Sequence, residues 1–236
     1  MRLRKRQSTM EALPTNRYPA ALDLGIAVGF FFVCYLSQPL LDPFLRHGRG
    51  LAMAFATAAY QFAFEGLAPL IIMAIRHEHF SDYGFTSRGA ARSLALAVAL
   101  AILYDLAMSW HAGAWLWVPM RRQPAIRMSL EAGFPACLVG LAATVAAWGF
   151  FEGFFGVFFA RKLNAALGQS GRGWLSPGAL GFALFNGWIH LTVGQGVEGF
   201  VESFASGYAI AVIPAVTGNS WGSALVQTLT DAVGKL

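Results

Sequence analysis

The sequence predicts an all-α fold, a polytopic membrane helix bundle with about seven transmembrane helices, in a range of about six to eight. The first reason is composition: 56% of the residues are hydrophobic, only 12% are charged, and the mean hydropathy is +0.53. An ordinary soluble domain carries about 25% charged residues. The second reason is that apolar runs close to the length of a membrane-spanning helix recur along the whole chain.

The predicted spans follow one another with short connections. We place them at residues 20–41, 51–75, 94–118, 134–160, 175–193, 200–216 and 221–233. The last run is short and is predicted to be half-buried. The basic opening MRLRKR is not followed by a compact apolar region with a cleavage site, so residues 1–19 are interpreted as a cytoplasmic tail and not as a signal peptide. Residues 20–236 are then a single membrane-embedded domain.

The distribution of Lys and Arg predicts the orientation, because cytoplasmic loops of membrane proteins are enriched in both. With the N-terminus inside, 11 of the 17 basic residues fall on the cytoplasmic side. These are Arg2, Arg4, Lys5, Arg6, Arg17, Arg76, Arg88, Arg92, Arg161, Lys162 and Arg172. We expect an integral, multi-pass protein of the bacterial inner membrane with a cytoplasmic N-terminus.

The net charge of +5 fits contact with anionic lipid headgroups, so membrane lipids are the first expected partners. No loop interleaves aromatic residues with a dense basic patch, which argues against nucleic-acid binding. The triplet His77, Glu78, His79 lacks the HExxH spacing of a zinc site and is interpreted as a solvated loop. No metal or cofactor is expected.

Three ionisable residues, Glu152, His190 and Asp231, interrupt otherwise uncharged apolar runs. A charge inside a bilayer is costly, so such residues usually face a protein interior or a cavity and mark function. We expect the three runs to pack together and to form one polar site. His190 is the expected hydrogen-bond donor for Asp231, and Glu152 and Asp231 would share a proton if they lie close together.

The neighbours of these residues support a shared site and also leave structural alternatives open. Gly149 and Gly153 form a GxxxG pair around Glu152, which allows a neighbouring helix to approach closely, so Glu152 can also be a polar anchor in a packing motif. Asn186 lies four residues before His190, and Gln227 lies four residues before Asp231. Each pair therefore shares a helix face.

Other polar positions are weaker candidates. The sequence GNSWG at residues 218–222 fits the GxSxG pattern of serine hydrolases, but that pattern needs a preceding strand, so Ser220 is predicted to cap a helix instead. Glu65 and Asp105, in the second and third spans, are expected either to line the same interior or to pair with arginines.

The order of these motifs resembles the CPBP family, which contains the CAAX prenyl endopeptidases and the Abi-type membrane proteins. The resemblance covers residues 134–236 and rests on WGFFEGFFGVFFARKL, on the span with His190, and on TGNSWGSALVQTLTDAV; DYGF at residues 82–85 is a weaker echo. The family pattern is EExxxR, then FxxxH, then a helix with His and Asn four residues apart. Here Phe151 replaces the first Glu, Glu152 matches the second, Gly156 replaces the Arg, and Asn186 replaces the Phe before His190.

In the last motif Gln227 stands at the family His and Asp231 at the family Asn. The resemblance implies an intramembrane endopeptidase that acts on prenylated or membrane-embedded peptides. Glu152 would be its acid/base, His190 the partner of Glu152, and Gln227 an oxyanion donor. Asp231 would join that donor set only when protonated.

The departures from the motifs leave two other functions open. One is a catalytically inactive homologue, a pseudoenzyme that binds a membrane protein or a lipid. The other is a proton-coupled transporter, because buried Glu, His and Asp can relay protons.

Overall fold

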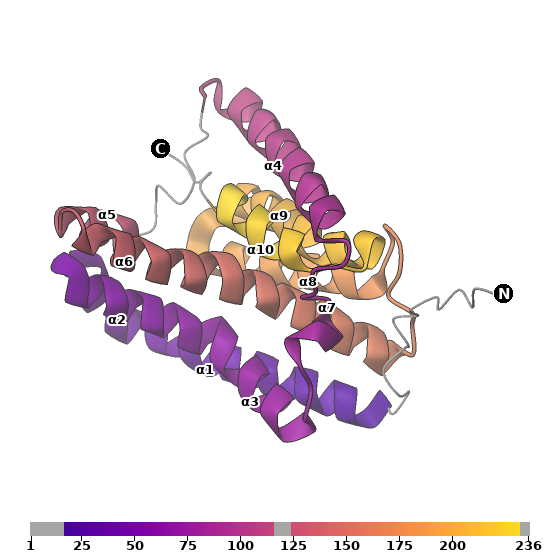
Figure 1. Cartoon of the computed structure of the whole chain (residues 1–236). Coiled ribbons are helices and arrows are strands. Elements are labelled where there is room, and N and C mark those ends of the chain that lie inside the picture. Colours follow the sequence, from indigo (N-terminus) through magenta and orange to yellow (C-terminus); the bar gives the residue numbers. More distant parts are fainter. Residues whose placement is uncertain (1–16, 116–123, 232–236) are drawn as a thin grey trace, which may run out of the picture.

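The computed structural model describes residues 17–115 and 124–231, and these form a bundle of α-helices without a β-strand (Figure 1). The α-helices are α1 (Arg17–His47), α2 (Gly50–Phe62), α3 (Ala68–Arg76), α4 (Ala90–Ala112), α5 (Pro124–Glu131), α6 (Ala136–Thr144), α7 (Glu152–Leu167), α8 (Pro177–His190), α9 (Gly196–Thr217) and α10 (Trp221–Thr230). Three π-helical segments are η1 (Ala63–Leu67), η3 (Val145–Phe151) and η4 (Leu191–Gln195), and η2 (Phe80–Tyr83) is a 3₁₀ turn. The all-α prediction is confirmed.

Five helices of the described chain are long and apolar enough to cross a membrane: Tyr18–Leu41, Gly50–Arg76, Ala90–Ala112, Ala136–Leu167 and Gly196–Thr217. Large apolar side chains such as Leu36, Leu40, Ile75 and Leu103 are exposed on them, which suits contact with lipid. These features indicate a multi-pass membrane protein.

The structure differs from the predicted count of about seven spans. The regions predicted as the fifth and seventh spans form α8 and α10, which have 14 and 10 residues and are shorter than a full bilayer crossing. Most of the predicted cytoplasmic tail, and the predicted span ends at Val118 and Val233, lie outside the described residues.

Two of the five candidate spans contain a π-helical segment near their middle. The first runs through α2, η1 and α3, and the second through α6, η3 and α7; Figure 1 shows them crossing the bundle side by side. Pro69, just after η1, has no N–H to donate to the carbonyl of residue 65, and its ring crowds that carbonyl. This explains why the helical hydrogen-bond pattern widens at Glu65.

Aromatic rings fill the core between α1, η1, α7 and α8. The Phe31 ring lies 4.2 Å from Phe64, 5.6 Å from Phe155 and 5.2 Å from Phe185, measured between ring centroids. Such packing holds α7, which carries Glu152 at its first residue, firmly against its neighbours.

Helices α7 and α10 approach each other closely at Gly153. A Cβ atom added there would lie 2.9 Å from the backbone oxygen of Ser223 and 3.0 Å from the Cα of Ala224. The close approach predicted from the GxxxG pair is thus confirmed at Gly153, and the helix that approaches is α10.

Candidate functional site

Glu65 and Glu152 form the centre of a buried carboxylate cluster, because one amide bridges them. Gln61 Nε2 lies 2.8 Å from Glu65 Oε2 and 3.3 Å from Glu152 Oε2. A side-chain amide nitrogen has two hydrogens, so Gln61 can donate to both carboxylates at once. Only 7% of the Glu65 surface is exposed.

Both carboxylates are positioned by π-helical segments. Glu65 lies inside η1, and Glu152 is the first residue after η3, which packs against η1. A π-helical turn rotates the residues that follow it relative to a regular helix and often occurs at functional sites. The two π-helical segments thus direct Glu65 and Glu152, which lie on separate spans, toward the same Gln61 side chain.

Asp231 and Gln227 bring α10 into this cluster. Asp231, at the end of α10, lies near enough to Glu65 and Glu152 to act on both electrostatically. Gln227 lies one turn earlier on the same face, is 4% exposed, and makes no side-chain hydrogen bond to a residue that the structure describes. Helix α10 therefore packs beside the segments that carry Glu152.

No Lys or Arg within the described ranges pairs with Glu65 or Glu152. Two carboxylates that share a site repel each other when both are ionised, and lipid surroundings strengthen that repulsion. A shared proton removes the repulsion. The arrangement can therefore hold a proton and exchange it with a bound group.

His190 does not join the carboxylate cluster as expected. It is the last residue of α8, and its Nδ1 lies 2.9 Å from Gln195 Oε1 in the adjoining η4. The π-helical turn of η4 brings Gln195 back to His190, so the Nδ1 of His190 has a local partner. Asn186, on the same helix face, donates to the Ser203 carbonyl of α9 at 2.9 Å.

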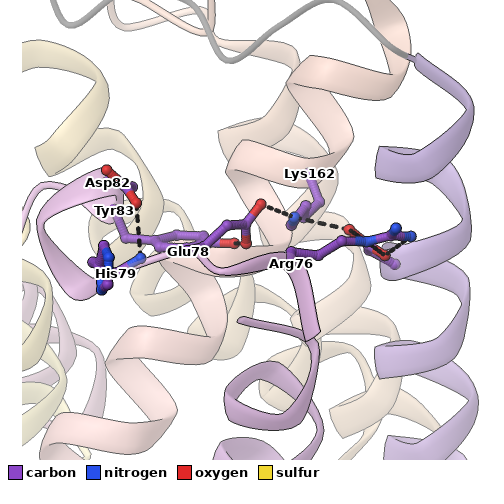
Figure 2. Close-up of polar contacts among 7 residues, drawn as sticks. Arg76, Glu78, His79, Asp82, Tyr83 and Lys162 are labelled. Carbon is purple, nitrogen blue, oxygen red and sulfur yellow. Dashed lines mark hydrogen bonds and ion pairs between the residues drawn. The ribbon is translucent and has the colours of Figure 1, made fainter. Parts of the chain in front are cut away.

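A second polar cluster, of ion pairs, lies at the end of the bundle where α1 begins and α3 and α7 end (Figure 2). We call this end the basic end. Lys162 Nζ lies 2.9 Å from Asp23 Oδ2 and 2.7 Å from Glu78 Oε1, and Arg76 Nη2 lies 2.8 Å from Asp23 Oδ1. Two cations and two carboxylates thus compensate one another, which is the condition for burying them.

Tyr83 extends this network, because its hydroxyl donates to Glu78. Its ring is 1% exposed and stacks on Phe158 with centroids 5.6 Å apart. Burial first, and then the hydrogen bond and the charge of Glu78, raise the pKa of the Tyr83 phenol well above its usual range.

The ion-pair cluster corrects two interpretations of the sequence. Lys162 is counted above among the basic residues of the cytoplasmic side, but it is 3% exposed and paired with Asp23 and Glu78 inside the bundle. In the loop at residues 77–79, interpreted as solvated, His77 and His79 are exposed as expected, but Glu78 is half-buried in the cluster. No group of metal-ligating side chains occurs in residues 17–115 and 124–231.

Ser220 directly precedes α10, as predicted, but does not cap it through its side chain. Its hydroxyl donates to the Tyr83 carbonyl, and its backbone N–H donates to the Gly84 carbonyl at 3.0 Å. The adjacent Asn219 donates to the Thr86 carbonyl at 2.7 Å. The GNSWG segment is therefore hydrogen-bonded to the DYGF segment and to the residue after it, and Ser220 has a structural role in this contact.

Glu65 and Asp105 were left with two alternatives. Glu65 lines the shared interior with Glu152. Asp105 is 4% exposed on α4, and its Oδ1 has no hydrogen-bond partner among the residues described. Neither residue pairs with an arginine in the described parts of the chain.

Sequence reasoning missed Gln61, Asp23 and the charge pairing of Lys162. Gln61 lies four residues before Glu65, the same spacing that drew attention to the pair on α10. Asp23 is the one acidic residue in the first apolar run, at residues 20–41. Both signals were available in the sequence.

Comparison with known proteins adds no relative: the chain matches no protein-family model, no curated protein and no solved structure.

Proposed function

We propose that this chain is a CPBP-like intramembrane endopeptidase in which Glu65 and Glu152 act as a proton-sharing acid pair on a prenylated or membrane-embedded peptide. The observation that carries the proposal is the Gln61 bridge, which holds the two carboxylates together without a described cation. Paired carboxylates with one shared proton are suited to acid–base hydrolysis, because one is a base while the other is an acid.

The chemistry follows from the two protonation states. The ionised carboxylate takes a proton from a water molecule, and the water oxygen bonds to the peptide carbonyl carbon. The protonated carboxylate donates its proton toward the carbonyl oxygen. When the C–N bond breaks, the departing amine takes a proton from one carboxyl group, and a hydroxyl of the tetrahedral intermediate returns a proton to the other carboxylate. The pair then has its starting single proton again.

Gln227 supplies the oxyanion donor in this proposal. Its amide makes no hydrogen bond to a described residue and lies on the α10 face that carries Asp231. The proposal thus keeps Glu152 from the pattern that resembles the CPBP family, and Gln227, at the position of the family His, supplies an amide donor from the last helix. Glu65 takes the role of partner to Glu152 that the resemblance would give to His190.

We further propose that α8 with η4, and α10, complete the membrane domain to about seven apolar segments. The positive-inside rule then places the basic end, with the start of α1, in the cytoplasm. A peptide would enter the carboxylate cluster from that side.

The test is cleavage of a fluorogenic farnesylated CAAX peptide by the purified chain in liposomes. We expect wild-type cleavage to fall by at least about 100-fold in Glu152→Gln and in Glu65→Gln, since general acid–base catalysis contributes about 10²–10⁴-fold. Glu131→Gln, at an exposed glutamate of α5, is the matched control and should retain activity. Equal activity in all four proteins overturns the proposal.

Non-catalytic binding is the second candidate, favoured by the pairing of His190 with Gln195 instead of a carboxylate. It predicts that the same peptide binds without being cleaved and that Glu152→Gln weakens this binding. Proton flux in peptide-free liposomes that stops in both glutamine variants would instead indicate transport.

A further inference from the structure

Two adjoining cavities open at the basic end, and arginines line both. One, of about 150 Å³, lies between α7, α9 and the loop before α8 and is lined by Arg161 and Arg172. The other, of about 670 Å³, lies between α9 and the start of α4 and is lined by Arg88, Arg92 and again Arg172. We call the two cavities together the arginine pocket.

The charged side chains described in the lining of the arginine pocket are all positive. Among the residues that the structure describes, four arginines line the two cavities, and no Asp or Glu does. Cations at a protein surface usually occur with carboxylates interspersed, so this lining produces a positive potential focused by the cavity walls.

Arg161 is the strongest indication that an anion belongs there. Its side chain is half-buried, and its guanidinium lies over the Tyr83 ring, 5.4 Å from the centroid. No described residue accepts a hydrogen bond from it. A guanidinium has five N–H donors, and burying them without an acceptor is unfavourable.

The adjacent Lys162 shows what this chain does with a cation that serves the fold. Lys162 contacts Asp23 and Glu78 at 2.9 Å and 2.7 Å. Arg161, one residue away, turns instead toward the pocket and finds no carboxylate at that distance. The two neighbouring cations therefore differ in their pairing: Lys162 is compensated by two carboxylates, and Arg161 lines the pocket without a described ion-pair partner.

The start of α4 adds backbone donors to the second cavity. Gly89, which precedes this helix of 23 residues, makes no side-chain cap, and both Gly89 and Arg92 line the cavity. The Ala90 N–H donates to the Ser87 carbonyl at 3.3 Å, and the remaining N–H groups of the first turn, with the positive end of the helix dipole, favour an anion at this place.

The position of the pocket, at the ends of membrane-spanning candidates, suits contact with lipid headgroups. It opens where α3, α7 and α9 end, and Trp174, two residues after Arg172, is 51% exposed. Tryptophan is enriched at the boundary between membrane and water. A ligand in this pocket can therefore reach it from the lipid surface or from solution.

We propose that the arginine pocket binds a phosphate group, with Arg161 and Arg172 as its main contacts. The planar guanidinium matches phosphate oxygens with two parallel hydrogen bonds, and Arg161 has its donors free for them. The phosphate belongs either to the headgroup of an anionic lipid or to a soluble phosphate compound. This site is separate from the carboxylate cluster and does not depend on the proposed peptidase activity.

The experiment measures binding to the purified full chain in nanodiscs, with two probes. In one arm the nanodiscs contain phosphatidylcholine alone, and pyrophosphate is titrated by calorimetry. In the other arm phosphatidic acid replaces a fifth of the lipid, and the rise in melting temperature is recorded. Pyrophosphate binding indicates a soluble ligand, and stabilisation by phosphatidic acid indicates a lipid headgroup; either result supports the phosphate site.

Variants decide whether the binding occurs in the arginine pocket. Arg161→Gln and Arg172→Gln should each weaken binding by about tenfold or more, as expected for a lost charge-assisted hydrogen bond. Arg161→Lys keeps the charge but loses the paired geometry, and should weaken binding as well. Arg49→Gln, an exposed arginine at the opposite end of the bundle, is the control and should bind normally.

Melting curves without ligand show whether each variant is folded, and Arg172, which is exposed, is the variant least expected to unfold. The proposal is overturned if neither probe binds to the wild-type protein. It is equally overturned if folded Arg161 and Arg172 variants bind as well as the wild type, or if Arg49→Gln weakens binding to the same extent.

Discussion

Lys162 Nζ lies 2.9 Å from Asp23 Oδ2 and joins α7 to α1, although the two residues are 139 positions apart in the sequence. Replacing Lys162 by Met leaves Glu78 without its cation and removes one of the two cations around Asp23. We expect a loss of about 3–5 kcal/mol of stability, because it leaves a buried charge uncompensated. Chemical unfolding of the wild type and of Lys162→Met in detergent measures this difference in the free energy of unfolding.

The double variant Asp23→Asn with Lys162→Met is the control for this pair. It removes opposite charges together, so its loss should be smaller than the sum of the two single losses. If the loss of stability in the double variant equals the sum of the two single losses, the contact between Asp23 and Lys162 contributes no interaction energy.

The Tyr83 hydroxyl donates to Glu78, and the pKa of Tyr83 is raised by burial. We expect Tyr83→Phe to lose about 1.5–3 kcal/mol at neutral pH, the range for a hydrogen bond to a charged group. The neutral phenol is favoured in the folded state, so its contribution is complete below the unfolded pKa of about 10 and declines as the pH rises above that value.

The stability difference between wild type and Tyr83→Phe, measured by unfolding from pH 7 to pH 11, should therefore shrink at the alkaline end. A difference that grows with pH would contradict the direction of the pKa shift.

Gly153 is where α10 reaches the backbone of α7, so a larger residue must push the helices apart. We expect Gly153→Ala to destabilise the fold by about 1–3 kcal/mol, since its Cβ would lie 2.9 Å from the Ser223 backbone oxygen. Gly29→Ala in α1, where no atom lies within 4 Å of the added Cβ, is the matched control. It should be neutral or stabilising, because Ala favours helix over Gly by about 1 kcal/mol.

Melting temperatures in the same detergent compare the two variants. If both shift equally, the close packing of α7 on α10 does not contribute to stability.

Much of the fold could be predicted because membrane helices carry strong signals. The apolar runs gave the five long helices, and the GxxxG pair indicated the close approach at Gly153. The short run at residues 221–233 already indicated the shortness of α10, but the shortness of α8 could not be predicted, since the apolar pattern continues past the residue where α8 ends.

The candidate site was predictable only in part. Glu152 and Asp231 stood out as charges in apolar runs, but the π-helical turns at η1 and η4 decide which partners they and His190 meet. Each π-helical turn changes the direction in which the following side chains point. A pattern analysed with 3.6 residues per turn does not predict that change. Likewise, the burial of Lys162 depends on Asp23 and Glu78, which come from distant segments.

The central claim is that Glu65 and Glu152 share a proton, and infrared spectroscopy of the purified protein at neutral pH tests it most directly. A protonated carboxyl group has a C=O stretch distinct from that of a carboxylate. We predict that the wild type shows this band, that Glu65→Gln and Glu152→Gln each lose intensity in it, and that the Glu131→Gln control retains it. A wild-type protein without the band, or a band of equal intensity in all four proteins, would contradict the account.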